Sequence, residues 1–170
     1  LPCCVVGTYK TMNFKMKNIF EHNHILPLFL FTVILGILLQ LLFLDAPLQS
    51  DDTTYFAIAK SLSLETFRNA HKQVSFRTGL LFPAYLIIKT FGYNILSYYI
   101  FSVGFSTLLI ISIFILTNRL IGALPAVLSS LLFSCSIFGL NRTTNLLPDV
   151  PNLFFLFASF YFFNISLEKT

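Results

Sequence analysis

Two short acidic segments hold the residues best suited to chemistry in this chain of 170 residues. Residues 50–55 read SDDTTY, and residues 147–151 read LPDVP. An ionised carboxylate can accept a proton as a general base, and neighbouring carboxylates could also bind a divalent cation. Asp51, Asp52 and Asp149 are therefore the candidate catalytic residues.

Each acidic segment also has a purely structural explanation. Ser50 is a favourable N-cap, and acidic residues in a first helical turn interact favourably with the helix dipole. Asp149 could likewise cap a following helix that has Pro151 in its first turn. The local sequence leaves the catalytic and the structural interpretation of both segments open.

Three basic residues, Arg77, Lys89 and Arg142, could hold a phosphate group through charge and hydrogen bonding. Alternatively, their side chains reach lipid headgroups at a membrane surface. The three cysteines, Cys3, Cys4 and Cys135, indicate neither a disulfide framework nor a metal site. The sequence therefore predicts no cofactor beyond a divalent cation that the acidic pair could bind.

The composition identifies the environment in which these residues work. Hydrophobic residues make up 56% of the chain and charged residues only 11%, with 21 phenylalanines. A soluble domain carries about a quarter charged residues, and disorder requires low hydrophobicity, so both classes are excluded. The basic residues form no stripe with aromatic residues, which argues against nucleic acid as a partner. The chain is predicted to be a multi-span membrane protein in contact with lipids.

Four apolar runs predict the membrane-spanning helices of an all-α polytopic protein. They cover residues 25–44, 96–116, 121–140 and 152–167, after a tail of residues 1–24, and a short turn is predicted at residues 117–119 between the second and third runs. If the lysine-containing tail is cytoplasmic, which the positive-inside rule supports weakly, both acidic segments lie on the non-cytoplasmic face. The first residue, Leu1, and the apolar run near Thr170 lead us to expect the N-terminal fragment of a longer protein.

The long outer loop, residues 45–95, is predicted to contain two helices that lie in the membrane interface. In residues 51–64, apolar side chains recur with helical spacing at Tyr55, Ile58, Ala59 and Leu62. Residues 80–91 are apolar but too few to cross a bilayer as a helix. These helices would position the first acidic segment at the membrane surface.

The order of these parts is more specific than any one of them. SDDTTY is followed by AIAK at residues 57–60, then by Arg77 and Pro83, by NRLIG at residues 118–122, and by the second acidic loop before a Phe-rich span. Over about residues 25–167, the chain resembles the N-terminal part of the GT-C superfamily of membrane glycosyltransferases. The resemblance is greatest to the group of protein mannosyltransferases, aminoarabinose transferases and rhizobial lipopolysaccharide transferases.

This resemblance implies roles for the candidate residues. Asp51 and Asp52, followed by Tyr55, match an acidic pair and aromatic residue of the superfamily's first outer loop, where one carboxylate is the base. Asp149 matches an auxiliary acidic residue of the second outer loop. The implied donor is a sugar on a polyprenyl phosphate, with the basic residues Arg77, Lys89 and Arg142 and also Tyr55 as donor-binding candidates. The implied reaction is inverting transfer to an acceptor lipid, glycan or protein on the non-cytoplasmic face.

A membrane transporter or a non-catalytic multi-span subunit is the alternative. Transporters usually place polar groups or helix breaks near the bilayer midplane. Here the predicted spans are almost free of charge and the acidic residues lie in loops, which favours chemistry at the membrane surface. The frequent Phe, Ile and Asn indicate an AT-rich genome, so we expect a bacterial inner membrane with the active site facing the periplasm or the outside. The fragment alone is expected to be inactive.

Overall fold

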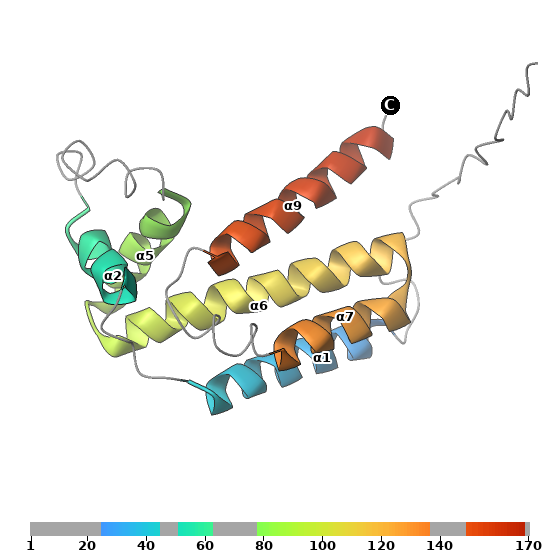
Figure 1. The fold of residues 1–170 in the computed structure, drawn as a ribbon, viewed down its shortest axis with the longest axis horizontal. Helices are drawn as coiled ribbons and strands as arrows, with labels where there is room; N and C mark the ends of the chain where they lie inside the picture. Colours follow the sequence, from blue (N-terminus) through green and yellow to red (C-terminus); the bar gives the residue numbers. More distant parts are fainter. Residues whose placement is uncertain (1–24, 45–50, 63–77, 137–148, 169–170) are drawn as a thin grey trace, which may run out of the picture.

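The computed structural model describes residues 25–44, 51–62, 78–136 and 149–168, in which every regular element is an α-helix. The prediction of an all-α fold is therefore confirmed. In chain order the helices are α1 (Ile25–Leu42), α2 (Asp51–Lys60), α5 (Thr78–Phe91), α6 (Ile95–Leu120), α7 (Ala123–Cys135) and α9 (Asp149–Glu168) (Figure 1). The tail of residues 1–24 lies outside the described part.

Three of these helices, α1, α6 and α9, are long and apolar enough to cross a membrane. Their outward faces are apolar as well: Phe160, Phe162 and Phe163 on α9 are each more than half exposed. Such side chains would be costly to expose to water, whereas lipid tails accommodate them. The surface of the helix bundle therefore supports a membrane environment independently of the composition.

The predicted third span, residues 121–140, is represented by a shorter helix. α7 has 13 residues, which corresponds to about 20 Å, less than the roughly 30 Å of a bilayer core. The preceding turn also lies later than residues 117–119, where the sequence predicts it, because α6 continues to Leu120. Gly122 has φ +128°, a conformation that glycine adopts readily, so the chain reverses there. Residues 137–140 lie outside the described part.

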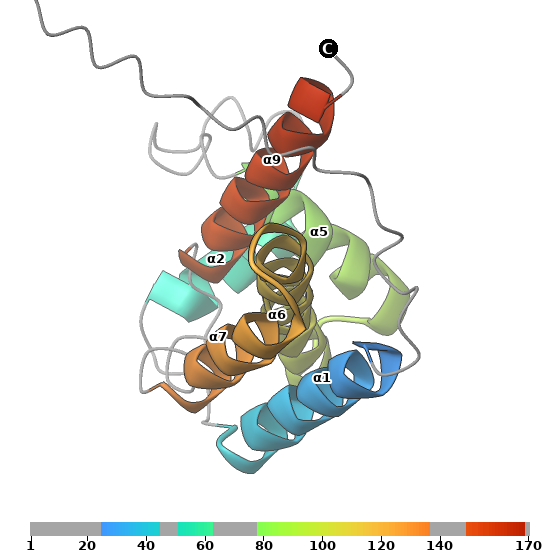
Figure 2. The same cartoon turned by 90° about the vertical axis from the view of Figure 1, so that its right-hand side faces the viewer.

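The neighbours of α6 run in different directions relative to it. Phe29 of α1 contacts Phe114 of α6 with ring centroids 5.1 Å apart, and Gln40 bonds to Ser106, so these helices are antiparallel. α9 runs parallel to α6, because Phe154 lies against Phe105 and Tyr161 against Arg119. Figures 1 and 2 show α1 and α7 packed on one side of α6 and α9 on the other. The first residues of α6 and α9 consequently face the same direction, with the first turns of α9 lying beside Phe105 of α6.

α1 approaches α6 and α7 through small and polar residues. Thr32, Gly36 and Gln40 recur every four residues and are the buried residues of this helix. A Cβ atom at Gly36 would lie 2.8 Å from Cδ1 of Ile110 and 3.2 Å from Oγ of Ser134. Membrane helices gain little from burying apolar side chains away from lipid, so close backbone approach and hydrogen bonds hold them together.

The hydrogen bond between Gln40 and Ser106 gives a testable prediction for this interface. Gln40 Nε2 donates to Ser106 Oγ at 2.6 Å, and Gln40 is only 2% exposed. Ser106→Ala leaves the buried amide without this acceptor and is expected to lower the free energy of unfolding by about 1–2 kcal/mol. Adding Gln40→Leu removes the unpaired amide and should recover part of this loss. Thermal unfolding in lipid bicelles checks the comparison, and a double variant less stable than Ser106→Ala would contradict it.

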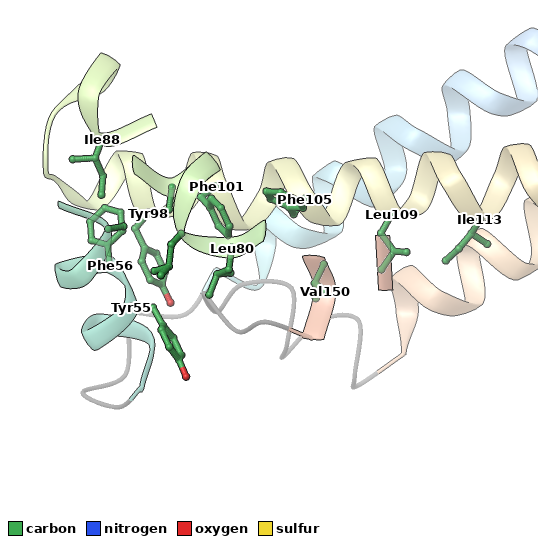
Figure 3. Packing of buried hydrophobic residues seen from close by; sticks show 13 residues of the cluster. Tyr55, Phe56, Leu80, Ile88, Tyr98, Phe101, Phe105, Leu109, Ile113 and Val150 are labelled. Carbon is green, nitrogen blue, oxygen red and sulfur yellow. The ribbon is translucent and has the colours of Figure 1, made fainter. Parts of the chain in front are cut away.

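α2 and α5 pack against the first half of α6. α5 contacts both α2 and α6, and one hydrophobic cluster continues from α2 through α5 and α6 to the first turn of α9. Figure 3 shows this row of side chains along α6, from Phe56 and Ile88 to Ile113. The two helices predicted in the outer loop are thus present, with α2 ending at Lys60 rather than at residue 64. Their packing determines where the first acidic segment lies.

Candidate functional site

Asp51 and Asp52 form the first turn of α2. One turn later, Tyr55 and Phe56 are 8% and 7% exposed, and Ala59 is fully buried. Ile58 and Leu62 are half-buried, which confirms the predicted apolar face. The helix is therefore fixed to the protein by its aromatic residues directly after the acidic turn.

Asp149 is the first residue of α9, and its side chain is exposed. Val150 is 2% exposed and Pro151 is buried, so the residues after the carboxylate fasten this turn to the core. The helix begins three residues before the predicted span at 152, which places Asp149 within the first turn rather than ahead of it. Pro151 permits this because the first turn of a helix does not use its backbone N–H groups.

Both acidic segments are anchored in the same hydrophobic cluster. Tyr55 and Phe56 join it from α2, and Val150 joins it from α9 (Figure 3). The other members of the cluster are Ala59 and apolar residues of α5 and α6, namely Leu80, Leu81, Ala84, Ile88, Tyr98, Phe101, Phe105, Leu109 and Ile113. Two carboxylate-bearing turns that are 97 positions apart in the chain (149 − 52) are thereby attached to the same cluster.

The basic candidates are only partly described. Lys89 lies exposed in the last turn of α5, with its Nζ 5.9 Å from the centroid of the Tyr85 ring. A cation at this helix end also interacts favourably with the helix dipole, so its position alone does not distinguish phosphate binding from a structural role. Arg77 and Arg142 lie outside the described residues.

The ring of Tyr55, a donor-binding candidate, is mostly enclosed by the protein. The sequence suggests an aromatic side chain available to the donor, but the ring is largely buried in the hydrophobic cluster. Its packing fixes α2, and only its small exposed part could reach a bound molecule. In the described part of the chain, no three acidic, histidine or cysteine side chains group as metal ligands. The side chains of Asp51 and Asp52 lie outside the described part of the chain.

The sequence did not reveal a second aromatic contact, which lies beside the later turns of α2. The ring of Phe56 stacks on Tyr93 with centroids 4.9 Å apart, and Lys60 Nζ lies 4.5 Å from the centroid of Tyr93. Residues 92–94 read GYN and indicate a break between helices. Nothing local connects that break with α2, which lies more than 30 positions earlier (93 − 60 = 33).

Comparison with known proteins adds evidence from outside the structure. A family model described as dolichyl-phosphate-mannose-protein mannosyltransferase matches residues 80–170. The match covers α6, α7, α9 and most of α5, and so includes Lys89, Arg142 and Asp149 but not the acidic pair of α2. No curated protein and no solved structure matches the chain.

Proposed function

Because this chain belongs to the dolichyl-phosphate-mannose-protein mannosyltransferase family, a family of membrane glycosyltransferases, we propose that it transfers a sugar from a polyprenyl phosphate to an acceptor on the non-cytoplasmic face. The acceptor is a hydroxyl or amine of a lipid, glycan or protein. The membrane in question is the bacterial inner membrane, with the site open to the periplasm or the outside. The proposed reaction accounts both for the membrane-spanning helices and for the carboxylates in the first turns of α2 and α9.

One observation carries the proposal. The turn with Asp51 and Asp52 and the turn with Asp149 are both fastened, through Tyr55 and Val150, to one hydrophobic cluster that runs along α6. A lipid-linked donor presents its sugar at the membrane surface while its chain stays in the bilayer. Carboxylates beside the ends of membrane-spanning helices meet such a sugar, whereas carboxylates at the bilayer midplane would not.

The proposed chemistry is a single displacement at the anomeric carbon. The acceptor oxygen or nitrogen forms a bond to that carbon while the bond from the carbon to the phosphate oxygen breaks. The acceptor proton passes to the carboxylate of Asp51 or Asp52, which acts as the general base. Attack from the side opposite the leaving group inverts the configuration, and polyprenyl phosphate departs with the electron pair.

The remaining candidates assist this displacement. Positive charge near the leaving phosphate stabilises the charge that develops on it, which is the role we assign to Lys89, Arg77 and Arg142. Asp149 is an auxiliary carboxylate that orients the acceptor, and Tyr55 fixes the base through its packing against the core. A divalent cation bound by the acidic pair would add positive charge at the same place.

Membranes from cells that produce the protein, compared with membranes from cells that lack it, test the proposal. Polyprenyl phosphates carrying different radiolabelled sugars are supplied, and label in the acceptor fraction is measured. The product is then digested with glycosidases specific for each anomer. Transfer that depends on the protein and inverts the anomeric configuration supports the proposal. Movement of the labelled lipid across the membrane without transfer would instead favour a transporter.

A further inference from the structure

A rigid turn joins α5 to α6 beside the acidic helix. Gly92 has φ +86°, and its N–H donates to the carbonyl of Ile88 at 2.8 Å. Asn94 caps α6, because its Oδ1 accepts from the N–H of Ser97 at 2.8 Å while its Nδ2 donates to the carbonyl of Phe91 at 2.9 Å. Ser97 Oγ closes the turn by donating to the carbonyl of Gly92 at 2.6 Å. The backbone around Tyr93 is therefore held by hydrogen bonds on both sides.

Tyr93 projects from this turn as an anchor for α2. Its ring stacks on Phe56 at an interplanar angle of 22°, and the ammonium of Lys60 lies over the same ring. Phe56 in turn meets Tyr98 edge-on, with centroids 5.7 Å apart. Phe56 and Lys60 are one helical turn apart, so the same face of α2 contacts the anchor twice.

Tyr93 contributes more through the orientation of its contacts with α2 than through burial of its ring. Tyr93 remains 47% exposed, so it contributes less to a buried core than a fully enclosed ring would. A stacked aromatic pair adds about 0.5–1.5 kcal/mol beyond its area, and an exposed cation over a ring adds about 0.5–1 kcal/mol. Both contacts depend on orientation, and they hold a short helix of 10 residues that would be marginal by itself.

We propose that Tyr93 is a positioning residue for the transfer reaction, which acts by fixing the direction of α2 and hence the place of its acidic first turn. This inference rests on the proposed function, because it assumes that a carboxylate of that turn is the base. Small displacements of a reacting group reduce rates strongly. Loss of the anchor should therefore slow the chemical step more than it weakens donor binding.

The first test measures the helix directly and does not depend on activity. Spin labels are attached at Ala57→Cys on α2 and Gly104→Cys on α6, both exposed positions, after the native cysteines are replaced by serine. Pulsed electron paramagnetic resonance then gives the distribution of distances between the labels. Tyr93→Leu should broaden the distribution, whereas Tyr93→Phe keeps the ring and should leave it unchanged.

Tyr161→Leu is the matched control. It also removes a tyrosine that lies under a cation, here Arg119 at 5.4 Å, but at the far end of α6 and α9. The distance distribution should remain that of the parent protein. A distribution as narrow in Tyr93→Leu as in the parent, or equally broad in Tyr161→Leu, would overturn the inference.

The second test measures transfer in the same variants without spin labels. Tyr93→Leu should lower kcat about tenfold, with less than about a twofold change in the KM for the donor, and Tyr93→Phe should retain the parent rate. If Tyr93→Leu broadens the distribution but transfers at the parent rate, while an Asp52→Asn or Asp51→Asn variant is inactive, the positioning role is wrong and the proposed function stands. If both asparagine variants are fully active, the base assignment fails, whatever the labels report.

Discussion

Changing the proposed catalytic carboxylate of α2 to an amide is expected to lower the rate of sugar transfer by about 10²- to 10⁴-fold. Asp51→Asn and Asp52→Asn are made separately, because only one of the two is assigned as the base. Asparagine has the size and shape of aspartate but cannot accept the acceptor's proton as a base. The measurement is the initial rate of label transfer in membranes at matched amounts of folded protein.

The same pair of substitutions separates the catalytic from the structural interpretation. At a helix start, Asn is about as good a cap as Asp, and the lost dipole interaction is worth only about 0.3–1 kcal/mol. A purely structural role therefore predicts nearly unchanged transfer in both variants. Glu65→Gln, in the same loop, makes the same chemical change at a residue without an assigned role and serves as the control. Wild-type rates in the double variant Asp51→Asn/Asp52→Asn would reject the base assignment.

Uncharged apolar runs in the sequence were sufficient to predict most of the helices. The runs that became α1, α6 and α9 contain almost no charge, and a polypeptide in lipid must satisfy its backbone hydrogen bonds within a helix. The apolar face of α2 was predicted from the spacing of Tyr55 and Ala59, both of which are buried. The local sequence is enough to predict such helices because each helix satisfies its backbone hydrogen bonds within itself.

The mispredicted boundary between α6 and α7 depends on a single residue, Gly122. The short turn was expected at residues 117–119 because Asn118 and Arg119 are polar, yet both lie within α6. Gly122 forms the turn instead, and its positive φ follows from the three-dimensional path between α6 and α7. Polarity indicates where a chain can leave the membrane, but it does not fix the residue at which the helix ends.

Contacts between distant segments could not be predicted from one sequence. Phe56 has apolar and aromatic neighbours within its own helix. Nothing in the local sequence indicates that its ring stacks instead on Tyr93, 37 positions later in the chain (93 − 56 = 37). The grouping of Tyr55 with Val150 likewise depends on how α5 and α6 pack between them. The acidic segments were identifiable from residue type and order, whereas their common anchor required the fold.

Gly36 provides the second large expected effect, on stability rather than on transfer. Gly36→Leu is expected to lower the free energy of unfolding by about 3 kcal/mol. A Cβ atom at this position already meets Cδ1 of Ile110 at 2.8 Å and Oγ of Ser134 at 3.2 Å, and the further leucine carbons must separate α1 from α6 and α7. Because the tip of Ile110 can turn away, Gly36→Ala should cost less than Gly36→Leu.

Gly104 offers a control of the same residue type in the adjoining helix. No atom lies within 4 Å of a Cβ built there, so Gly104→Leu should be neutral or stabilise the protein by up to about 1 kcal/mol through helix propensity. Unfolding in bicelles, followed by circular dichroism, compares the three variants with the parent. Equal losses at both glycines would mean that the close approach of α1 does not hold the bundle together. A large loss at Gly36 alone would show that the first span is held against α6 and α7 by the close approach of their backbones.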